Sequence, residues 1–121
     1  MKVLVVDAAN VVGSVPDGWW KDRPGAAARL HRNLLAADLP FDQVILVLEG
    51  KASAGVPSGT QGIVTVVHAP GSGDDELVAQ CRATSDQAEV TLVSADRGLT
   101  ARVEALGVAT CGPRTLYSWL A

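Results

Sequence analysis

The sequence alternates between short, uninterrupted apolar runs and segments in which apolar residues recur at helical spacing. Five runs are consistent with strands: Val3–Val6, Gln43–Leu48, Ile63–Val67, Glu89–Val93 and the shorter Gly107–Thr110. Aliphatic and β-branched runs without polar alternation are typical of strands buried on both faces of a parallel sheet. We therefore predict a mainly parallel sheet with Val3–Val6, the most uniformly apolar run, at its centre.

Helical spacing of apolar residues occupies most of the intervening sequence. In Pro24–Asp38, a single stripe carries Ala26, Leu30, Leu34 and Ala37, and proline suits the first helical position. Three further helices are expected: one begins around Asp74–Glu76 and runs to about Gln87, one is marked by Leu99–Leu106, and one spans Pro113–Leu120. This succession of strands and helices predicts an α/β layer fold.

Two segments rich in glycine and small residues predict loops. The first, Val11–Gly25, contains Trp19 and Trp20 close to Lys21 and Arg23. A tryptophan pair flanked by cations can stack a base and bind a phosphate, or it can be a hydrophobic plug that holds the loop against the next helix. Both interpretations remain open at this stage. The second segment, Lys51–Gly62, predicts a flexible loop.

Composition narrows the classes of function. The 121 residues predict one domain, 1–121, and 48% of them are hydrophobic. The net charge of −3 and pI near 5.2 argue against a broad basic surface for duplex DNA, but allow a nucleic acid held through metals and a few arginines. No stretch reaches the length of a membrane span, and Asp7 interrupts any signal-peptide pattern. We expect a cytoplasmic protein without a membrane partner.

Acidic residues follow four of the five predicted strands. They are Asp7 after the first, Glu49 after the second, Asp74 and Asp75 after the third, and Asp96 after the fourth. The carboxyl ends of parallel strands share one edge of the sheet, where ligands bind in open α/β folds. Carboxylates gathered there repel one another unless a cation is present, and oxygen ligands suit Mg²⁺ or Mn²⁺. The pattern predicts metal-assisted hydrolysis of a phosphodiester or phosphoanhydride.

Each acid also has a purely structural explanation. Asp7 can cap a turn or helix start, and Asp96 can be the N-cap of the following helix. Asp74 and Asp75 can complement a helix dipole, and Glu49 can be an exposed turn residue. Acids at four successive strand ends favour the metal site over four independent coincidences, with Glu49 its weakest member.

Three motifs, VVDAAN at 5–10, GSGDDELVA at 71–79 and VSADRGL at 93–99, resemble the PIN-like nuclease superfamily, and more closely its NYN/YacP-like branch. The resemblance spans nearly the whole chain. It implies a three-layer, Rossmann-like domain with a mainly parallel five-stranded sheet of order 3-2-1-4-5. It also implies an endoribonuclease dependent on Mg²⁺ or Mn²⁺.

The resemblance assigns Asp7, Asp74, Asp75 and Asp96 as catalytic, metal-binding acids, to which we add Glu49 as a further ligand. Asn10 beside Asp7, and Arg97 beside Asp96, are candidate substrate contacts. The loop contributes three more candidates, Trp19, Trp20 and Arg23.

Three functions are compatible with these residues. The first is a metal-dependent ribonuclease acting on single-stranded or structured RNA. The second is a nucleotide pyrophosphohydrolase that uses the same acids. The third is a non-catalytic module that binds RNA or a protein. A homodimer and a protein partner are both left open.

Overall fold

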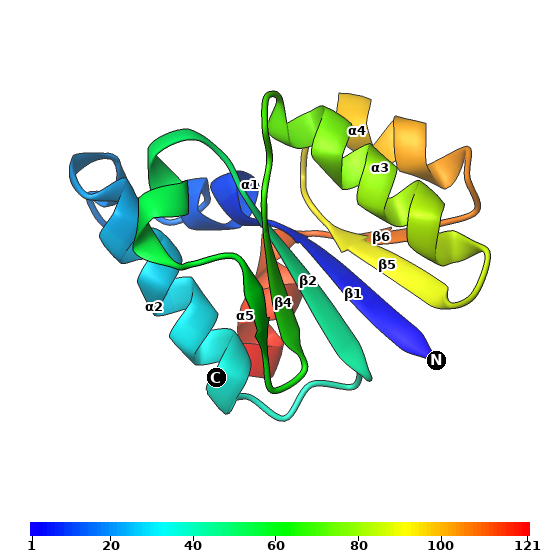
Figure 1. The fold of residues 1–121 in the computed structure, drawn as a ribbon, viewed down its shortest axis with the longest axis horizontal. Helices are drawn as coiled ribbons and strands as arrows, with labels where there is room; N and C mark the ends of the chain where they lie inside the picture. The colour runs from blue at the N-terminus through cyan, green and yellow to red at the C-terminus, as the bar shows by residue number, and fades with distance from the viewer.

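A computed structural model describes all residues, 1–121, and consists of a six-stranded sheet with helices on both faces (Figure 1). The strands are β1 (Lys2–Asp7), β2 (Gln43–Leu48), β3 (Gly59–Gln61), β4 (Val64–His68), β5 (Glu89–Val93) and β6 (Ala109–Cys111). The helices are α1 (Ala8–Gly13), α2 (Arg23–Ala36), α3 (Gly73–Ser85), α4 (Arg97–Glu104) and α5 (Pro113–Leu120), with 3₁₀ turns η1 (Trp19–Lys21) and η2 (Gly50–Gly55). None of the helices combines the length and apolar character needed to cross a membrane.

The sheet confirms the predicted α/β class and has one strand more than predicted. Its order is β3-β4-β2-β1-β5-β6, with β1 between β2 and β5 as expected. The five parallel strands keep the predicted order 3-2-1-4-5, and β3 joins the edge as an antiparallel partner of β4. Turn η2 begins at Gly50, and β3 follows it within the segment 51–62, so the segment is not the flexible loop that was predicted but contains a turn and a short strand. All three β3 residues are exposed, which explains why the strand has no apolar signature.

The central strand supplies both hydrophobic cores, because successive side chains point to opposite faces of a sheet. On one face, Leu4 and Val6 belong to a core of 16 buried residues that includes Leu34 of α2. On the other, Val3 and Val5 belong to a core of 11 buried residues with contributions from α3 and α4. The two cores fix three layers and leave the carboxyl end of β1 pointing toward the loops that form the candidate site.

Two local predictions need correction. The segment after Asp7 was expected to be a loop from Val11 onward, but Ala8–Gly13 forms helix α1 directly after β1. Helix α2 begins at Arg23 and ends at Ala36, two residues short of the predicted end. Its N-cap is Asp22, whose carboxylate accepts a hydrogen bond from Gly25 N at 3.0 Å. Helix α5 has the bounds that the sequence predicted.

The difference in burial between Leu34 and Arg32 predicts that their substitution changes the free energy of unfolding by very different amounts. Leu34 is fully buried in the larger core, so Leu34→Ala should lower the free energy of unfolding by about 2–5 kcal/mol through lost contacts and a residual cavity. Arg32 is exposed on the same helix, and Arg32→Ala should change stability by no more than about 0.5 kcal/mol. Urea denaturation followed by circular dichroism measures both. Equal losses in the two variants would contradict the assigned packing of α2.

Candidate functional site

Asp7 is a buried carboxylate at the end of the central strand, with only 6% of its surface exposed. Its Oδ1 accepts a hydrogen bond from Asn10 N at 3.3 Å and thereby caps α1, and its Oδ2 accepts one from the Ser94 hydroxyl at 2.9 Å. The pKa of Asp7 is raised above the ordinary carboxyl value of 3.8, chiefly because burial disfavours its charge. The two hydrogen bonds lower this pKa, and the charges of Asp74 and Glu49 raise it further. Asp7 therefore caps helix α1 and also carries a negative charge that burial disfavours.

Ser94 links Asp7, at the end of β1, to the end of β5, and the sequence did not identify it as a site residue. Ser94 is 3% exposed and directly follows β5, and its Oγ accepts a hydrogen bond from Asp96 N at 3.1 Å while donating to Asp7. The signal was present in the VSAD run, where a serine directly follows a buried strand two residues before an acid.

Asn10 makes a second contact between the start of α1 and the residues that follow β5. Its Oδ1 accepts a hydrogen bond from Ala95 N at 2.8 Å, so that it ties the first turn of α1 to the β5–α4 connection. The side-chain amide oxygen of Asn10 is thus already hydrogen-bonded to the backbone N–H of Ala95. This contact positions the Asp7 and Asp96 segments against each other.

Glu49 lies against the start of α3. Its Oε2 accepts a hydrogen bond from Gly73 N at 2.9 Å, which is a favourable place for a carboxylate because a helix N-terminus carries partial positive charge. A Cβ at Gly73 would lie 2.6 Å from the Glu49 carboxyl carbon, so glycine permits this approach. Glu49 is only partly exposed, and its charge raises the pKa of both Asp7 and Asp74. Thus Glu49 is a central member of the acidic group.

The two aspartates that begin α3 point in different directions. The pKa of Asp74 is raised first by burial and then by the charges of Asp96 and Glu49, while Arg102 lowers it. Asp75 is exposed and pairs with Arg102 of α4 at 3.2 Å. The difference follows from the roughly 100° rotation between neighbouring helical residues. Asp74 is therefore close enough to Asp96 and Glu49 for their charges to act on it, while Asp75 is paired with α4.

Asp96 and Arg97 lie at the exposed start of α4. Asp96 is the N-cap, because its Oδ1 accepts a hydrogen bond from Leu99 N at 3.1 Å. Its capping role and its charge coupling to Asp74 coexist, since a carboxylate has two oxygens and several lone pairs. Arg97 is exposed and makes no ion pair.

The donor set suits a hard divalent cation, since its charged groups are carboxylates, which supply the oxygen ligands that Mg²⁺ and Mn²⁺ prefer. The side chains as they stand, however, include no group of three or more His, Cys, Asp or Glu arranged to hold a metal ion. The acids are close enough for Asp96 and Glu49 to raise the pKa of Asp74. Ion binding would require Asp74, which is partly exposed, and Asp96, which is exposed, to turn inward.

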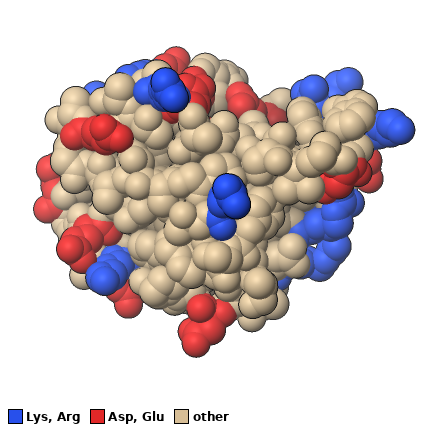
Figure 2. All heavy atoms as spheres, turned by 180° about the vertical axis from the view of Figure 1, so that it is seen from behind, with Lys and Arg blue, Asp and Glu red and all other residues tan.

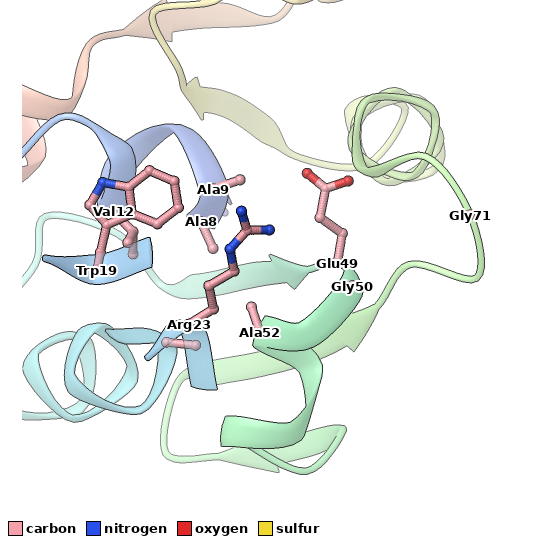
Figure 3. A pocket seen from close by; sticks show the side chains of 10 residues that line it. Ala8, Ala9, Val12, Trp19, Arg23, Glu49, Gly50, Ala52 and Gly71 are labelled. Atoms are coloured by element: carbon pink, nitrogen blue, oxygen red, sulfur yellow. The ribbon is translucent and has the colours of Figure 1, made fainter. Parts of the chain in front are cut away.

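A pocket of about 470 Å³ lies beside the acids (Figure 3). It is lined by Ala8, Ala9, Val12, Trp19, Arg23, Ala27, Glu49, Gly50, Ala52 and Gly71. Trp19 forms one wall with the Arg23 guanidinium 5.4 Å from its ring centre, and Glu49 lies on the other side. Trp20 is 54% exposed and contacts Trp19 edge-on outside the lining. The tryptophan loop thus borders the acidic group through Trp19.

Comparison with known proteins gives a structural match but no match by sequence. No family model matches the chain, and no curated protein sequence matches it. The crystal structure of Rae1 (YacP) from Bacillus subtilis, as the W164L mutant, superposes with a TM-score of 0.75 at 16% identity. The match covers 99% of this chain and 75% of the Rae1 chain. The two proteins therefore share a fold over nearly all of the present chain.

The raised pKa of Asp7 predicts a specific pH dependence of stability. The folded protein holds the Asp7 proton more tightly than the unfolded chain, so this contribution is full below the unfolded pKa and is lost as pH rises through the folded pKa. Asp7→Asn removes that loss. Without divalent metal, melting temperatures from pH 4 to 7 should fall less steeply for Asp7→Asn than for wild type, with the variant at least as stable at pH 7. Asp38→Asn, at an exposed carboxylate, is the control, and a variant curve parallel to wild type would refute the interpretation.

The Ser94 hydroxyl should contribute measurably to stability because its loss leaves a buried carboxylate oxygen and the Asp96 N–H without that partner. We expect Ser94→Ala to reduce the free energy of unfolding at pH 7 by about 1–3 kcal/mol. Ser118 is exposed and bonds only within its own helix, so Ser118→Ala should cost much less. Chemical denaturation of both variants provides the comparison, and indistinguishable midpoints would rule out the proposed link.

Proposed function

We propose that this protein is a divalent-metal-dependent ribonuclease that hydrolyses RNA phosphodiester bonds at the carboxyl edge of its sheet. The supporting observation is that Asp7, Glu49, Asp74 and Asp96 come from separate strand ends and that their charges act on one another: Asp74 and Glu49 raise the pKa of Asp7, and Asp96 and Glu49 raise that of Asp74. Such mutual repulsion costs stability and is relieved when a cation binds. A fold does not need four such acids at one edge for packing alone.

The acids have distinct roles in this proposal. Asp7 is the fixed ligand, because burial and two hydrogen bonds hold its carboxylate in one orientation. Asp74 and Asp96 complete the ion site from the starts of α3 and α4, and Glu49 holds the α3 start in place through Gly73 N. Asp75 belongs to the Arg102 ion pair and is assigned no ligand role.

A bound Mg²⁺ or Mn²⁺ supplies charge neutralisation at the phosphate and a water of lowered pKa. The chain's own residues orient the reaction around it. Buried Asp7 would hold the ion at the sheet edge, and exposed Arg97 is available to contact a phosphate oxygen. The hydroxyl of Ser94 holds the Asp7 carboxylate and the Asp96 backbone next to each other through one hydrogen bond to each.

Two further observations favour RNA as substrate. The motifs at 5–10, 71–79 and 93–99 resemble the NYN/YacP-like branch, and the fold matches a protein that carries the YacP name. The helix α2 side of the molecule also carries a group of cations: Lys and Arg gather at the right of Figure 2, where the view from behind puts η1 and α2. These elements carry exposed Lys21, Arg23, Arg29 and Arg32. A cytoplasmic location fits this substrate.

Substitution of the two neighbouring aspartates of α3 separates the proposed metal-ligand role of Asp74 from the ion pair of Asp75. Asp74→Asn should reduce metal-dependent RNA cleavage by at least about 100-fold, because it removes a ligand of the ion that stabilises the transition-state charge. Asp75→Asn, at the adjacent exposed position, should retain activity within a few-fold. A fluorescent RNA oligonucleotide with Mn²⁺ provides the assay. Equal activity of Asp74→Asn and wild type would contradict the assignment.

A substrate panel distinguishes the remaining alternatives. Wild type and Asp7→Asn are incubated with RNA, single-stranded DNA and nucleoside triphosphates, with Mn²⁺ or with EDTA. The proposal requires RNA cleavage that Asp7→Asn and EDTA both abolish. Release of pyrophosphate from triphosphates without RNA cleavage would indicate a nucleotide pyrophosphohydrolase. RNA binding without any hydrolysis would indicate a non-catalytic module.

A further inference from the structure

We propose that the pocket between Trp19 and Glu49 binds one unpaired nucleobase of the substrate, stacked on Trp19, while Arg23 binds an adjacent backbone phosphate. The inference rests on the proposed ribonuclease function, since it assumes a nucleotide substrate. It specifies which feature of that substrate the protein recognises. The supporting evidence is the position, shape and charge of the pocket.

Position connects the pocket to the acids. Its lining residues Ala8 and Ala9 begin the helix that Asp7 caps, and Glu49 belongs to both the lining and the acidic group. Gly71 lies two residues before the start of α3. A ligand in the pocket is therefore next to the carboxylates that would hold the ion, because Glu49 lines the pocket and Asp7 caps the helix that Ala8 begins.

The shape and lining suit a flat aromatic ring. A volume of about 470 Å³ falls within the range of small-molecule sites. Six of the ten lining residues are hydrophobic, and most of the lining is alanine or glycine, so few side chains protrude into the space. Trp19 is its sole aromatic group (Figure 3). A tryptophan wall facing small residues leaves room for a planar base, which gains stacking energy whatever its sequence identity.

The charges of the pocket suit a nucleotide with its phosphate on the Arg23 side. The guanidinium lies over the Trp19 ring, and Figure 3 shows it directed into the pocket. In the proposal, the base takes the place of the guanidinium on the ring, and Arg23 turns to the adjacent phosphate. The one ion pair in the protein joins Arg102 to Asp75, so the Arg23 cation has no carboxylate partner and is available for bidentate phosphate binding. Glu49, on the other side, repels a phosphate in the absence of a cation.

The base must be unpaired to enter. A base within a duplex is stacked on both faces and hydrogen-bonded along its edge, so it reaches a concave pocket only by leaving the helix. The pocket therefore favours single-stranded segments, loops and bulges over continuous duplex RNA.

Tryptophan fluorescence tests the pocket directly, because the three tryptophans can be separated. The reporter is Trp20→Phe/Trp119→Phe, which keeps only Trp19. The control is Trp19→Phe/Trp20→Phe, which keeps only Trp119, a residue that packs edge-on against Phe41 and lines a different pocket. Each protein is titrated in EDTA, with excitation at 295 nm, using AMP and ribose 5-phosphate as probes.

AMP should quench the Trp19 reporter saturably, while ribose 5-phosphate leaves it unchanged and the Trp119 control responds to neither. Adding Arg23→Gln to the reporter should weaken AMP binding at least several-fold. In cleavage assays with the whole protein, Trp19→Ala should raise KM for a single-stranded RNA oligonucleotide about ten-fold or more. Trp19→Phe should have a KM close to that of wild type. No saturable quenching by AMP, or equal quenching of both proteins, would overturn the proposal. A response to N-acetyl-tyrosinamide in place of AMP would also overturn it and assign the pocket to a protein partner.

The test distinguishes failure of the pocket from failure of the proposed enzyme. Binding is measured without metal, and a reporter carrying Asp7→Asn should still bind AMP. Quenching by AMP together with no RNA hydrolysis would support the base pocket and contradict the proposed ribonuclease function. Metal-dependent hydrolysis without quenching would retain the ribonuclease and remove the base pocket.

Discussion

The burial of the Asp7 carboxylate at the end of the central strand is the constraint on which the site depends. A charge that is 6% exposed is costly unless it is hydrogen-bonded, and this one has two donors from different parts of the chain. The donor from Asn10 N begins helix α1, and the donor from Ser94 joins strand β1 to the end of β5. The same two contacts that stabilise the charge thus fix the geometry around it. Even so, burial dominates and the pKa of Asp7 is raised.

A network of side-chain to backbone hydrogen bonds extends from Asp7 across the edge of the sheet. Ser94 accepts from Asp96 N, Asn10 accepts from Ala95 N, and Glu49 accepts from Gly73 N at the start of α3. Asp7 and Asp96 thus cap α1 and α4, and Glu49 accepts a hydrogen bond at the start of α3, where partial positive charge stabilises a carboxylate. Capping and ion binding are compatible explanations of the same residues, since each oxygen of a carboxylate can accept more than one contact.

The apolar pattern predicted the parallel strands and the edge at which the acids lie, because buried strands must be continuous apolar runs and parallel strands share a carboxyl edge. The strand order was implied by the resemblance of the three motifs to the NYN/YacP-like branch. The prediction from sequence missed β3 because an exposed edge strand of Gly, Thr and Gln needs no apolar residues. It missed α1 because the Asp7 cap allows a helix to follow a strand without an intervening turn. It treated Asp74 and Asp75 alike, since sequence alone does not fix the rotation of α3 about its axis. The Glu49 contact with Gly73 joins residues 24 positions apart, and no local pattern reports it.

Crystallography with Mn²⁺ tests the central claim most directly, because anomalous scattering locates the ion independently of any assay. The account predicts an anomalous peak bounded by the carboxylates of Asp7, Asp74 and Asp96, with Asp74 and Asp96 turned inward and Asp75 still paired with Arg102. The peak should disappear in Asp7→Asn crystals grown under the same conditions. A Mn²⁺ peak only elsewhere on the protein, or none at a concentration that supports RNA cleavage, would contradict the claim that these acids form the metal site.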